Sequence, residues 1–376
     1  MIRTRVRFLL DPMIVQQVVM PVSGAVSWTV LGNDGDPIEP VETYLTYLSA
    51  LERSPNTQRA YATSLKFWFE FLGRVEIGWA DVGINEVARF VSWLRAPADN
   101  VIVLDTGSAV RSPATVNRHL AAVFGFYEHQ ARSGVDVAAE LVAWRRVGRG
   151  SYKPFLHHVT KGRPVPTRPI KLAVPRLAPP TLSDEELVAV LSAPEHARDR
   201  FLLALLAETG MRIGQALGLR HADFVSRDKE VWIVPRGDNA NGARAKLRTP
   251  AVVPVTAGLV RSYSDYMHHE YGDVDSDYVF VNLWGGRIGA PLTYPAVERL
   301  VCRIRSHTGI AFTLHMLRHT HATELIRSGV AIEVVARLLT HRSSTTTSQT
   351  YVHLDVADTR AALQRAGVWG ETGERL

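Results

Sequence analysis

Cysteine is almost absent from this chain of 376 residues, which contains Cys302 and no other. A single cysteine excludes an internal disulfide framework and a multi-cysteine zinc module, and it fits a reducing compartment. No segment approaches the roughly 18 uninterrupted apolar residues that a membrane-spanning helix requires. The basic and apolar start loosely resembles a secretion signal, but Asp11-Pro12 interrupts it. We therefore expect a cytoplasmic protein with no membrane partner.

Acidic residues are absent between Leu141 and Ser183. Outside this segment the chain has 34 basic and 37 acidic residues, so the whole excess behind the net charge of +6 lies within it. A concentrated cationic segment is typical of proteins that bind a polyanion. Seven prolines between Pro154 and Pro180 also disfavour helix, which predicts an extended interdomain linker over residues 141–180. Its nine cations are candidate binding residues: Arg145, Arg146, Arg149, Lys153, Lys161, Arg163, Arg168, Lys171 and Arg176.

Helical periodicity begins near residue 40 and separates residues 1–39 from the segment that follows. Residues 1–39 have no helical period and a turn signal at Asn33-Asp34-Gly35, which predicts a short strand-bearing leader or arm. An all-α domain is predicted over residues 40–140. Its four amphipathic segments are 41–51, 55–73, 84–94 and 113–132.

The second domain is predicted over residues 181–376. Ser183 and Glu186 have the spacing of a capping box, and helices are expected near 184–193 and 197–209. Two β-branched runs at 231–234 and 252–255 predict an antiparallel hairpin, and the chain from 262 to 366 is expected to be mostly helical. The predicted fold class is therefore mainly α, with an all-α N-terminal domain and a C-terminal α+β domain that contains a small antiparallel sheet.

Three stretches of the second domain concentrate unusual polar residues. Arg212 follows a glycine turn, His315 and Arg318 share one helix face, and His341 and Tyr351 flank a run of hydroxyl residues. Taken singly, each has an ordinary explanation, such as a surface arginine at a helix start or a tyrosine packed in a core.

A metal site is one alternative, because His315 and His319 have the i, i+4 spacing found in zinc helices. The glutamate that would act as general base in that motif is absent. Arg318 lies inside the candidate cluster, where a cation would oppose a dication. We expect no metal ion.

Together the three stretches resemble the tyrosine recombinase (phage integrase) family, whose signature is Arg…Lys…His-x-x-Arg…His…Tyr in this order. Arg212 matches the first arginine, His315 and Arg318 the His-x-x-Arg box, His341 the next histidine and Tyr351 the nucleophile. The resemblance spans residues 40–366. Two N-terminal segments resemble the SAM-like core-binding domain of the family: Ser54-Pro-Asn-Thr-Gln-Arg-Ala-Tyr and Ser112-Pro-Ala-Thr-Val-Asn-Arg-His-Leu.

The lysine of the signature lies on a hairpin of variable length in the family, and the candidate here is Lys246. Only six of the 43 basic residues are lysines, and none follows Lys246. A general acid must release its proton, which arginine with a pKa above ~12 does not do. An ordinary surface lysine is the alternative that remains open.

The resemblance implies a mechanism. Tyr351 would attack a DNA phosphodiester, form a 3′-phosphotyrosyl bond and free a 5′-hydroxyl. Arg212 and Arg318 would hold the non-bridging oxygens, because planar guanidinium groups match phosphate. His315 would accept or orient a proton, His341 would donate a hydrogen bond, and Lys246 would protonate the leaving oxygen. Neither a metal nor ATP nor another cofactor is expected.

Double-stranded DNA is the expected partner, with the linker along its phosphates and the protein nucleoid-associated when bound. The resemblance implies site-specific recombination (integration, excision or transposition) by a homodimer on one site and a homotetramer in the synapse, with a directionality factor or second recombinase as further partners. Alternatives are a type IB topoisomerase, a non-catalytic DNA-binding relative and a metal-dependent hydrolase. Two positions depart from the family pattern, which usually has Glu at Gln215 and Gly at Thr340.

Overall fold

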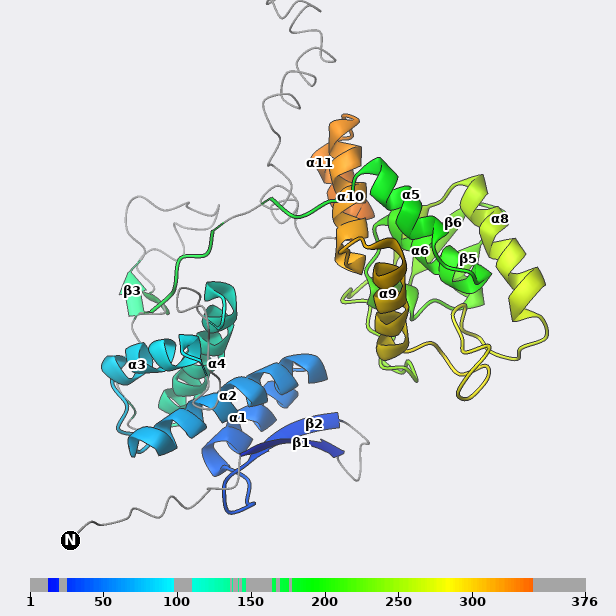
Figure 1. The fold of residues 1–376 in the computed structure, drawn as a ribbon. Helices are drawn as coiled ribbons and strands as arrows, with labels where there is room; N and C mark the ends of the chain where they lie inside the picture. Colours follow the sequence, from blue (N-terminus) through cyan, green and yellow to red (C-terminus); the bar gives the residue numbers. More distant parts are fainter. Residues whose placement is uncertain are drawn as a thin grey trace, which may run out of the picture. The chain divides into compact units, whose positions relative to one another are not determined.

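The computed structural model describes residues 13–19, 26–97, 110–135, 137, 141, 170–175 and 178–340, and the backbone of 144–146 and 164–166. The chain divides into two compact units, Met1–Pro175 and Arg176–Leu376. We call them the N-terminal unit and the C-terminal unit and describe each by itself (Figure 1).

Four helices form most of the described N-terminal unit, and local sequence explains where two of them begin. Ser54 and Ser112 each accept a hydrogen bond from the backbone N–H three residues later, at 3.3 Å, and proline takes the first helical position in both cases. The helices are α1 (Glu39–Ala50), α2 (Pro55–Val75), α3 (Ile84–Arg95) and α4 (Pro113–Arg132). All four fall where the amphipathic pattern predicts helices.

Aromatic rings dominate the core between these helices. Trp68, Phe90 and Tyr127 are fully buried, and the Trp68 ring meets each of the other two edge to face. The indole N–H of Trp68 donates to the Tyr127 hydroxyl at 3.1 Å, and this hydroxyl donates to the Trp79 carbonyl at 2.8 Å. The buried polar groups of Trp68 and Tyr127 are therefore satisfied without charge.

The predicted strands of the leader are present as β1 (Ile14–Val19) and β2 (Val26–Leu31), which pair antiparallel. They lie against α2, and Val30 is completely buried (Figure 1). The leader thus contributes to the core of the N-terminal unit.

The predicted linker contains a short antiparallel pair, β3 (Trp144–Arg146) with β4 (Pro164–Pro166). Farther along, Ile170 and Leu172 pack against the core of the N-terminal unit. Asn117 on α4 both donates to the Leu172 carbonyl and accepts from its N–H, at 2.9 Å each. Residues 170–175 are therefore fastened to the N-terminal unit.

The C-terminal unit combines helices with one three-stranded antiparallel sheet. Strand β6 (Glu230–Ile233) lies between β5 (Phe224–Val225) and β7 (Ala251–Pro254), with Val231 opposite Val253. The predicted hairpin is therefore present, and the mainly α class with a small antiparallel sheet is confirmed. The helices are α5 (Asp184–Ser192), α6 (Ala197–Thr209), α7 (Ile213–Ala216), α8 (Ala257–Tyr266), α9 (Tyr294–Thr308), α10 (Leu314–Arg327) and α11 (Ile332–Leu338).

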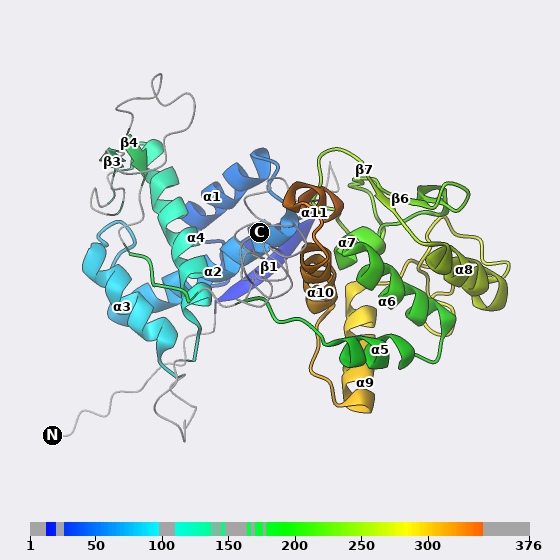
Figure 2. The ribbon, with the colours of Figure 1, turned by 90° about the horizontal axis from the view of Figure 1, so that it is seen from above.

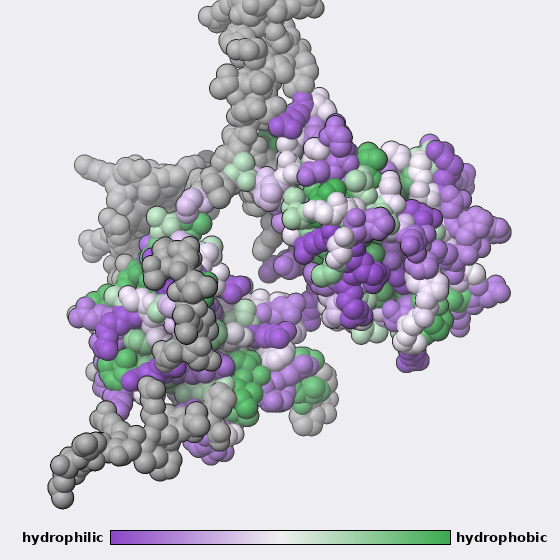
Figure 3. Space-filling view, in the orientation of Figure 1, coloured by the Kyte–Doolittle hydropathy of each residue, from purple (hydrophilic) through white to green (hydrophobic). Residues whose placement is uncertain are grey.

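Helix α6 is central in this unit and packs against α5, α7, α8 and α10 (Figure 2). Its buried face includes Phe201, Leu202 and Leu205. Hydrophilic side chains dominate the surface of the C-terminal unit in the face shown in Figure 3, and hydrophobic ones form small separate patches.

Residues 272–293 are an exception to the mostly helical structure expected after residue 262, which the described residues otherwise show. This stretch is irregular, with isolated bridges from Tyr278 to Arg220 and from Val281 to Pro291. Residues 278–281 are all buried, and the hydroxyls of Tyr266 and Tyr271 donate to backbone carbonyls of this run. Tertiary contacts satisfy the backbone here in place of a helix.

None of the helices in the described part of the chain is long and apolar enough to cross a membrane.

Candidate active site

Arg212 is held at the start of α7 by a glycine turn. Gly210 caps the C-terminus of α6, and its φ of +60° suits a residue without a Cβ. A Cβ at this position would lie 2.7 Å from Leu339 and 2.8 Å from His321, so the close approach also requires glycine. Arg212 then forms the N-cap of α7, with its side chain half-buried.

Arg318 on α10 is the most deeply buried of the three predicted catalytic cations, with 1% of its surface exposed. Its Nη1 donates to the Gly210 carbonyl and its Nη2 to the Leu339 carbonyl, both at 2.6 Å. The guanidinium group is thereby fixed between the turn before Arg212 and the end of α11. A cation held in one orientation at a site of low dielectric acts strongly on a nearby anion.

His315 lies one turn before Arg318 on α10 and has a lowered pKa. Although His315 is an exposed residue, partial loss of water around its ring is the first cause, followed by the positive charges of Arg318, Arg212 and Lys246. Hydrogen bonds bring the same segments together, although the sequence separates them by up to 106 positions. Arg318 donates to Gly210, two residues before Arg212, and Gln215 joins Arg212 to Ala245, the residue before Lys246. A lowered pKa keeps the imidazole neutral at pH 7 and able to accept a proton.

Lys246 is exposed, and its φ is +55°. It follows Ala245, whose carbonyl accepts a hydrogen bond from the buried Gln215 side chain at 3.2 Å. The backbone before Lys246 is therefore tied to α7. Its electrostatic influence on His315 favours the catalytic interpretation over that of an isolated surface lysine.

His341 and Tyr351 lie outside the described residues. Thr340, immediately before His341, is described, and its hydroxyl accepts a hydrogen bond from Nη1 of Arg212 at 3.2 Å. Thr340 is the last described residue before His341 and Tyr351, and it contacts Arg212.

The sequence did not reveal that Gln215 and Thr340 bond to Arg212 and to each other. It showed them only as departures from the family pattern. The Gln215 amide accepts from the Arg212 backbone N–H at 2.7 Å and donates to the Thr340 hydroxyl at 2.9 Å. The sequence did contain a signal for them, because both departures are polar side chains close to signature residues: Gln215 lies three positions after Arg212, and Thr340 directly precedes His341.

The other histidines of α10, His319 and His321, have strongly lowered pKa values. Burial, followed by nearby positive charge, lowers the pKa of His319 and of His321 to about 4. The His315 and His319 rings are 4.4 Å apart and meet edge to face. Within the described residues, no group of three or more His, Cys, Asp or Glu is arranged to hold a metal ion.

Of the nine linker cations, Lys171 has a described side chain, and it is exposed. Arg145 and Arg146 lie on β3, where the structure describes the backbone. Six cations lie outside the described residues: Arg149, Lys153, Lys161, Arg163, Arg168 and Arg176.

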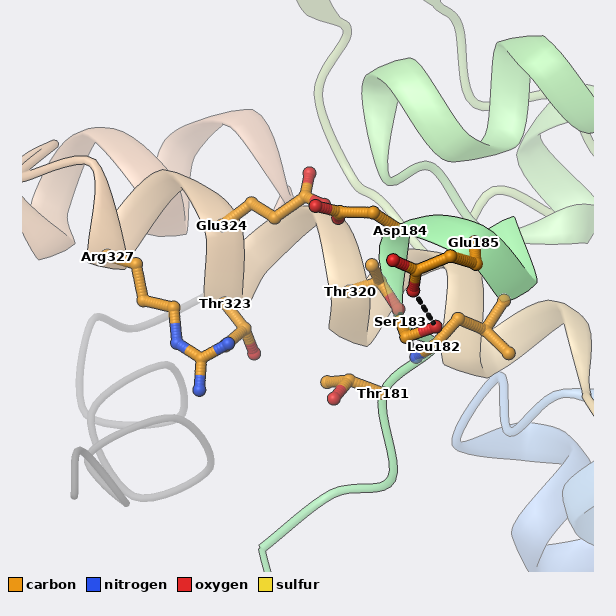
Figure 4. Close-up of a pocket in the computed structure, with 9 residues that line it drawn as sticks. All are labelled: Thr181, Leu182, Ser183, Asp184, Glu185, Thr320, Thr323, Glu324 and Arg327. Carbon is orange, nitrogen blue, oxygen red and sulfur yellow. Dashed lines mark hydrogen bonds between the residues drawn. The ribbon is translucent and has the colours of Figure 1, made fainter. Parts of the chain in front are cut away.

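A separate cavity of about 290 Å³ lies between the start of α5 and α10 (Figure 4). Asp184, Glu185 and Glu324 line it together with Arg327, and Ser183 donates to Glu185 at 2.9 Å. Burial and the neighbouring Asp184 raise the pKa of Glu324. This predominantly acidic lining disfavours a phosphate, so the Arg212–Lys246–Arg318 cluster remains the candidate site for an anion.

Residues 180–358 match the phage integrase family, and residues 41–134 match the phage integrase N-terminal SAM-like domain. Transposase A from transposon Tn554 of Staphylococcus aureus is 39% identical over 333 residues, which are 88% of this chain and 91% of the relative. Tyrosine recombinase XerA of Thermococcus onnurineus is 29% identical over 330 residues, 87% of this chain and 95% of the relative.

A solved structure of a lambda integrase (75–356) dimer bound to a COC′ core site has the same fold, with a TM-score of 0.57 and 15% identity. The match covers 83% of this chain and 94% of that one. Sequence and fold agree over both units. The chain belongs to the phage integrase family of tyrosine recombinases, enzymes of site-specific DNA recombination.

Proposed function

We propose that Tyr351 of this recombinase cleaves and rejoins double-stranded DNA, with Arg212, Lys246, His315, Arg318 and His341 as the other catalytic residues. The observation that carries the proposal is the convergence of three cations on His315, which lowers its pKa. Three positive charges around one neutral base suit a phosphodiester, whose transition state gathers negative charge while the attacking hydroxyl loses a proton.

In the proposed reaction the Tyr351 hydroxyl attacks the phosphorus, and the bond from phosphorus to the 5′-oxygen breaks. His315 takes or orients the tyrosine proton, and Lys246 gives a proton to the departing 5′-oxygen. Arg318, already fixed by two carbonyls, and Arg212 hold the non-bridging oxygens, while His341 donates a further hydrogen bond to phosphate. One phosphoester replaces another, so the reverse attack by a second 5′-hydroxyl rejoins DNA without ATP, a metal ion or another cofactor.

The proposed division of labour follows the chain. Residues 40–140 grip DNA, residues 141–180 form a cationic linker along the phosphates, and residues 181–376 cut and rejoin, with 1–39 as a leader. The protein acts as a homodimer on one site and a homotetramer on two, and it is nucleoid-associated while bound. A directionality factor or second recombinase completes the assembly where the direction of exchange is controlled.

Transposition is the biological role that the similarity to Transposase A supports, because the shared identity of 39% extends over nearly the whole of that relative. We therefore propose the ends or the joined circular form of a mobile element as the substrate class.

A nicked suicide substrate tests the proposal. Such DNA loses a short 5′-hydroxyl fragment after cleavage, so the covalent protein–DNA adduct accumulates. We expect a 3′ adduct with the native protein, no adduct with Tyr351→Phe, and an unaltered adduct with Tyr47→Phe, which removes a partly exposed hydroxyl of the N-terminal unit. An adduct that survived Tyr351→Phe would overturn the nucleophile assignment.

The same assay in excess chelator should give the same adduct, whereas a metal-dependent hydrolase would lose activity. Exchange of strands between two differently labelled duplexes should then accompany cleavage. Relaxation of a supercoiled circle without exchange would indicate a topoisomerase instead.

A further inference from the structure

Gln215 connects the segments that carry the proposed catalytic residues. It is 2% exposed, on the short helix α7. Its Oε1 accepts from the Arg212 backbone N–H at 2.7 Å, and its Nε2 donates to the Thr340 hydroxyl at 2.9 Å and the Ala245 carbonyl at 3.2 Å. One side chain thus joins the backbone of Arg212 to the residues that immediately precede Lys246 and His341.

Thr340, which accepts a hydrogen bond from Gln215, has an unfavourable backbone conformation. Its φ is +54°, in the left-handed region, which a β-branched residue rarely adopts. Glycine would take this conformation without strain. The hydroxyl that glycine would lack accepts from Gln215 at 2.9 Å and from Nη1 of Arg212 at 3.2 Å, so both of its lone pairs are used.

The two side chains are matched in hydrogen-bond chemistry. An amide donates and accepts at the same time, whereas a carboxylate at position 215 would only accept and would face the Ala245 carbonyl without a proton to give. The amide of Gln215 can therefore hold Ala245 and Thr340 together while it also holds Arg212. Strain that persists in a buried residue next to a functional group indicates a functional constraint.

We propose that Gln215 and Thr340 are a pair of positioning residues, which set the Arg212 guanidinium group and the backbone before Lys246 and His341 for attack on the phosphate. This inference rests on the proposed function. Neither side chain needs to touch DNA. Their effect is on the rate of cleavage once DNA is bound, because a displacement of about 1 Å in a catalytic group lowers rates by up to about a hundredfold.

The first test compares Thr340→Val with Thr340→Ser in the full chain. Valine keeps the shape and the backbone strain but removes the hydroxyl, and serine keeps the hydroxyl. With saturating suicide substrate, we expect the first-order rate of adduct formation to fall about tenfold to a hundredfold in Thr340→Val and less than about threefold in Thr340→Ser. The dissociation constant for uncleaved DNA should change less than about threefold in both.

Thr308→Val is the matched control. The Thr308 hydroxyl also makes two hydrogen bonds, to the Ile304 carbonyl and from the Ile310 N–H, at the end of α9. This variant should cleave at the native rate. Equal rates for Thr340→Val and Thr340→Ser would overturn the proposal, as would a loss confined to DNA affinity.

A double-mutant cycle with Gln215→Met tests the pairing itself. If the two side chains act as a unit, the combined Gln215→Met and Thr340→Val protein should cleave about as slowly as the slower single variant. Its rate should be well above the rate expected if the two single-variant losses multiplied. Independent, multiplicative losses would contradict the pairing.

The outcomes separate this inference from the proposed function. If the native protein forms no Tyr351-dependent adduct, the proposed function fails. If it forms one and the Thr340 variants do not differ, the chemistry stands and the positioning role is overturned.

Discussion

The N-terminal unit places Trp68, Phe90 and Tyr127 at its centre, whereas the C-terminal unit buries Arg318 and several other charged side chains. Among the described residues, every buried Asp, Glu, Lys or Arg belongs to the C-terminal unit: Arg198, Asp199, Asp223 and Arg318. Arg198 pairs with Asp199 and Asp223 with Arg236, and two backbone carbonyls hold Arg318.

This difference indicates that the N-terminal core is organised for stable packing, whereas the C-terminal unit also holds a charged side chain in a fixed orientation. Apolar rings and neutral hydrogen bonds give a stable core with few desolvated charges. A buried charge costs free energy unless it is well bonded, and it contributes little net stability even then. A fully buried arginine whose fork is fixed by two carbonyls is therefore a feature that function, more than folding, accounts for.

The largest expected effect comes from Arg318→Lys. Lysine keeps the charge but loses the planar fork that contacts two carbonyls and, in the proposed mechanism, phosphate. We expect cleavage of a bound suicide substrate to slow by about 10²- to 10³-fold. DNA affinity should fall less than about tenfold. A single-turnover rate within threefold of the native one would mean that Arg318 is structural only.

In the N-terminal unit the matching change is Tyr127→Phe. Removal of this hydroxyl leaves the buried Trp68 N–H without its acceptor, and we expect the free energy of unfolding to fall by about 1–3 kcal/mol. Urea denaturation followed by circular dichroism measures it, with Tyr47→Phe as the control at less than about 0.5 kcal/mol. Where the protein remains folded, the adduct should form at the native rate. A slower reaction in the folded variant would contradict the view that the core of the N-terminal unit serves stability and not catalysis.

Acid should destabilise the C-terminal unit through His321. Its folded-state pKa of about 4 lies below the unfolded value near 6.5, so the unfolded chain binds the proton first. Stability is therefore lost as the pH falls from about 6.5 to 4, by up to about 3 kcal/mol. His321→Gln should show a smaller decrease in melting temperature between pH 7 and pH 4.5 than the native protein. An identical decrease would exclude His321 as the cause.

The smallest effect is expected from cations of the linker. Replacement of Arg163, Arg168 and Lys171 by Gln should reduce the slope of log Kd against log salt by about 0.9 for each phosphate that these side chains neutralise in the native complex. The single control Lys229→Gln removes an exposed cation from the turn between β5 and β6. An unchanged slope in the triple variant would contradict the proposed path of DNA along the linker.

Much of the fold follows from local sequence. Ser54-Pro55 and Ser112-Pro113 indicate the starts of α2 and α4, and Ser183 with Glu186 indicates the start of α5. The irregular run 272–293 was not predictable in this way, because its buried residues 278–281 have the composition of a core segment of either kind. Its conformation depends on partners such as Arg220 and Tyr266, which lie outside the run.

By itself the sequence determined the chemical types and their order, because a guanidinium, a lysine, an imidazole and a tyrosine in one fixed succession restrict the chemistry to very few reactions. Only the tertiary structure decided that Arg212, Lys246 and Arg318 act together on His315, since electrostatic influence depends on distance and burial. The tertiary structure also revealed that Gln215 and Thr340 interact. The sequence presents them as two unrelated departures, 125 positions apart, and the fold makes them hydrogen-bond partners at 2.9 Å.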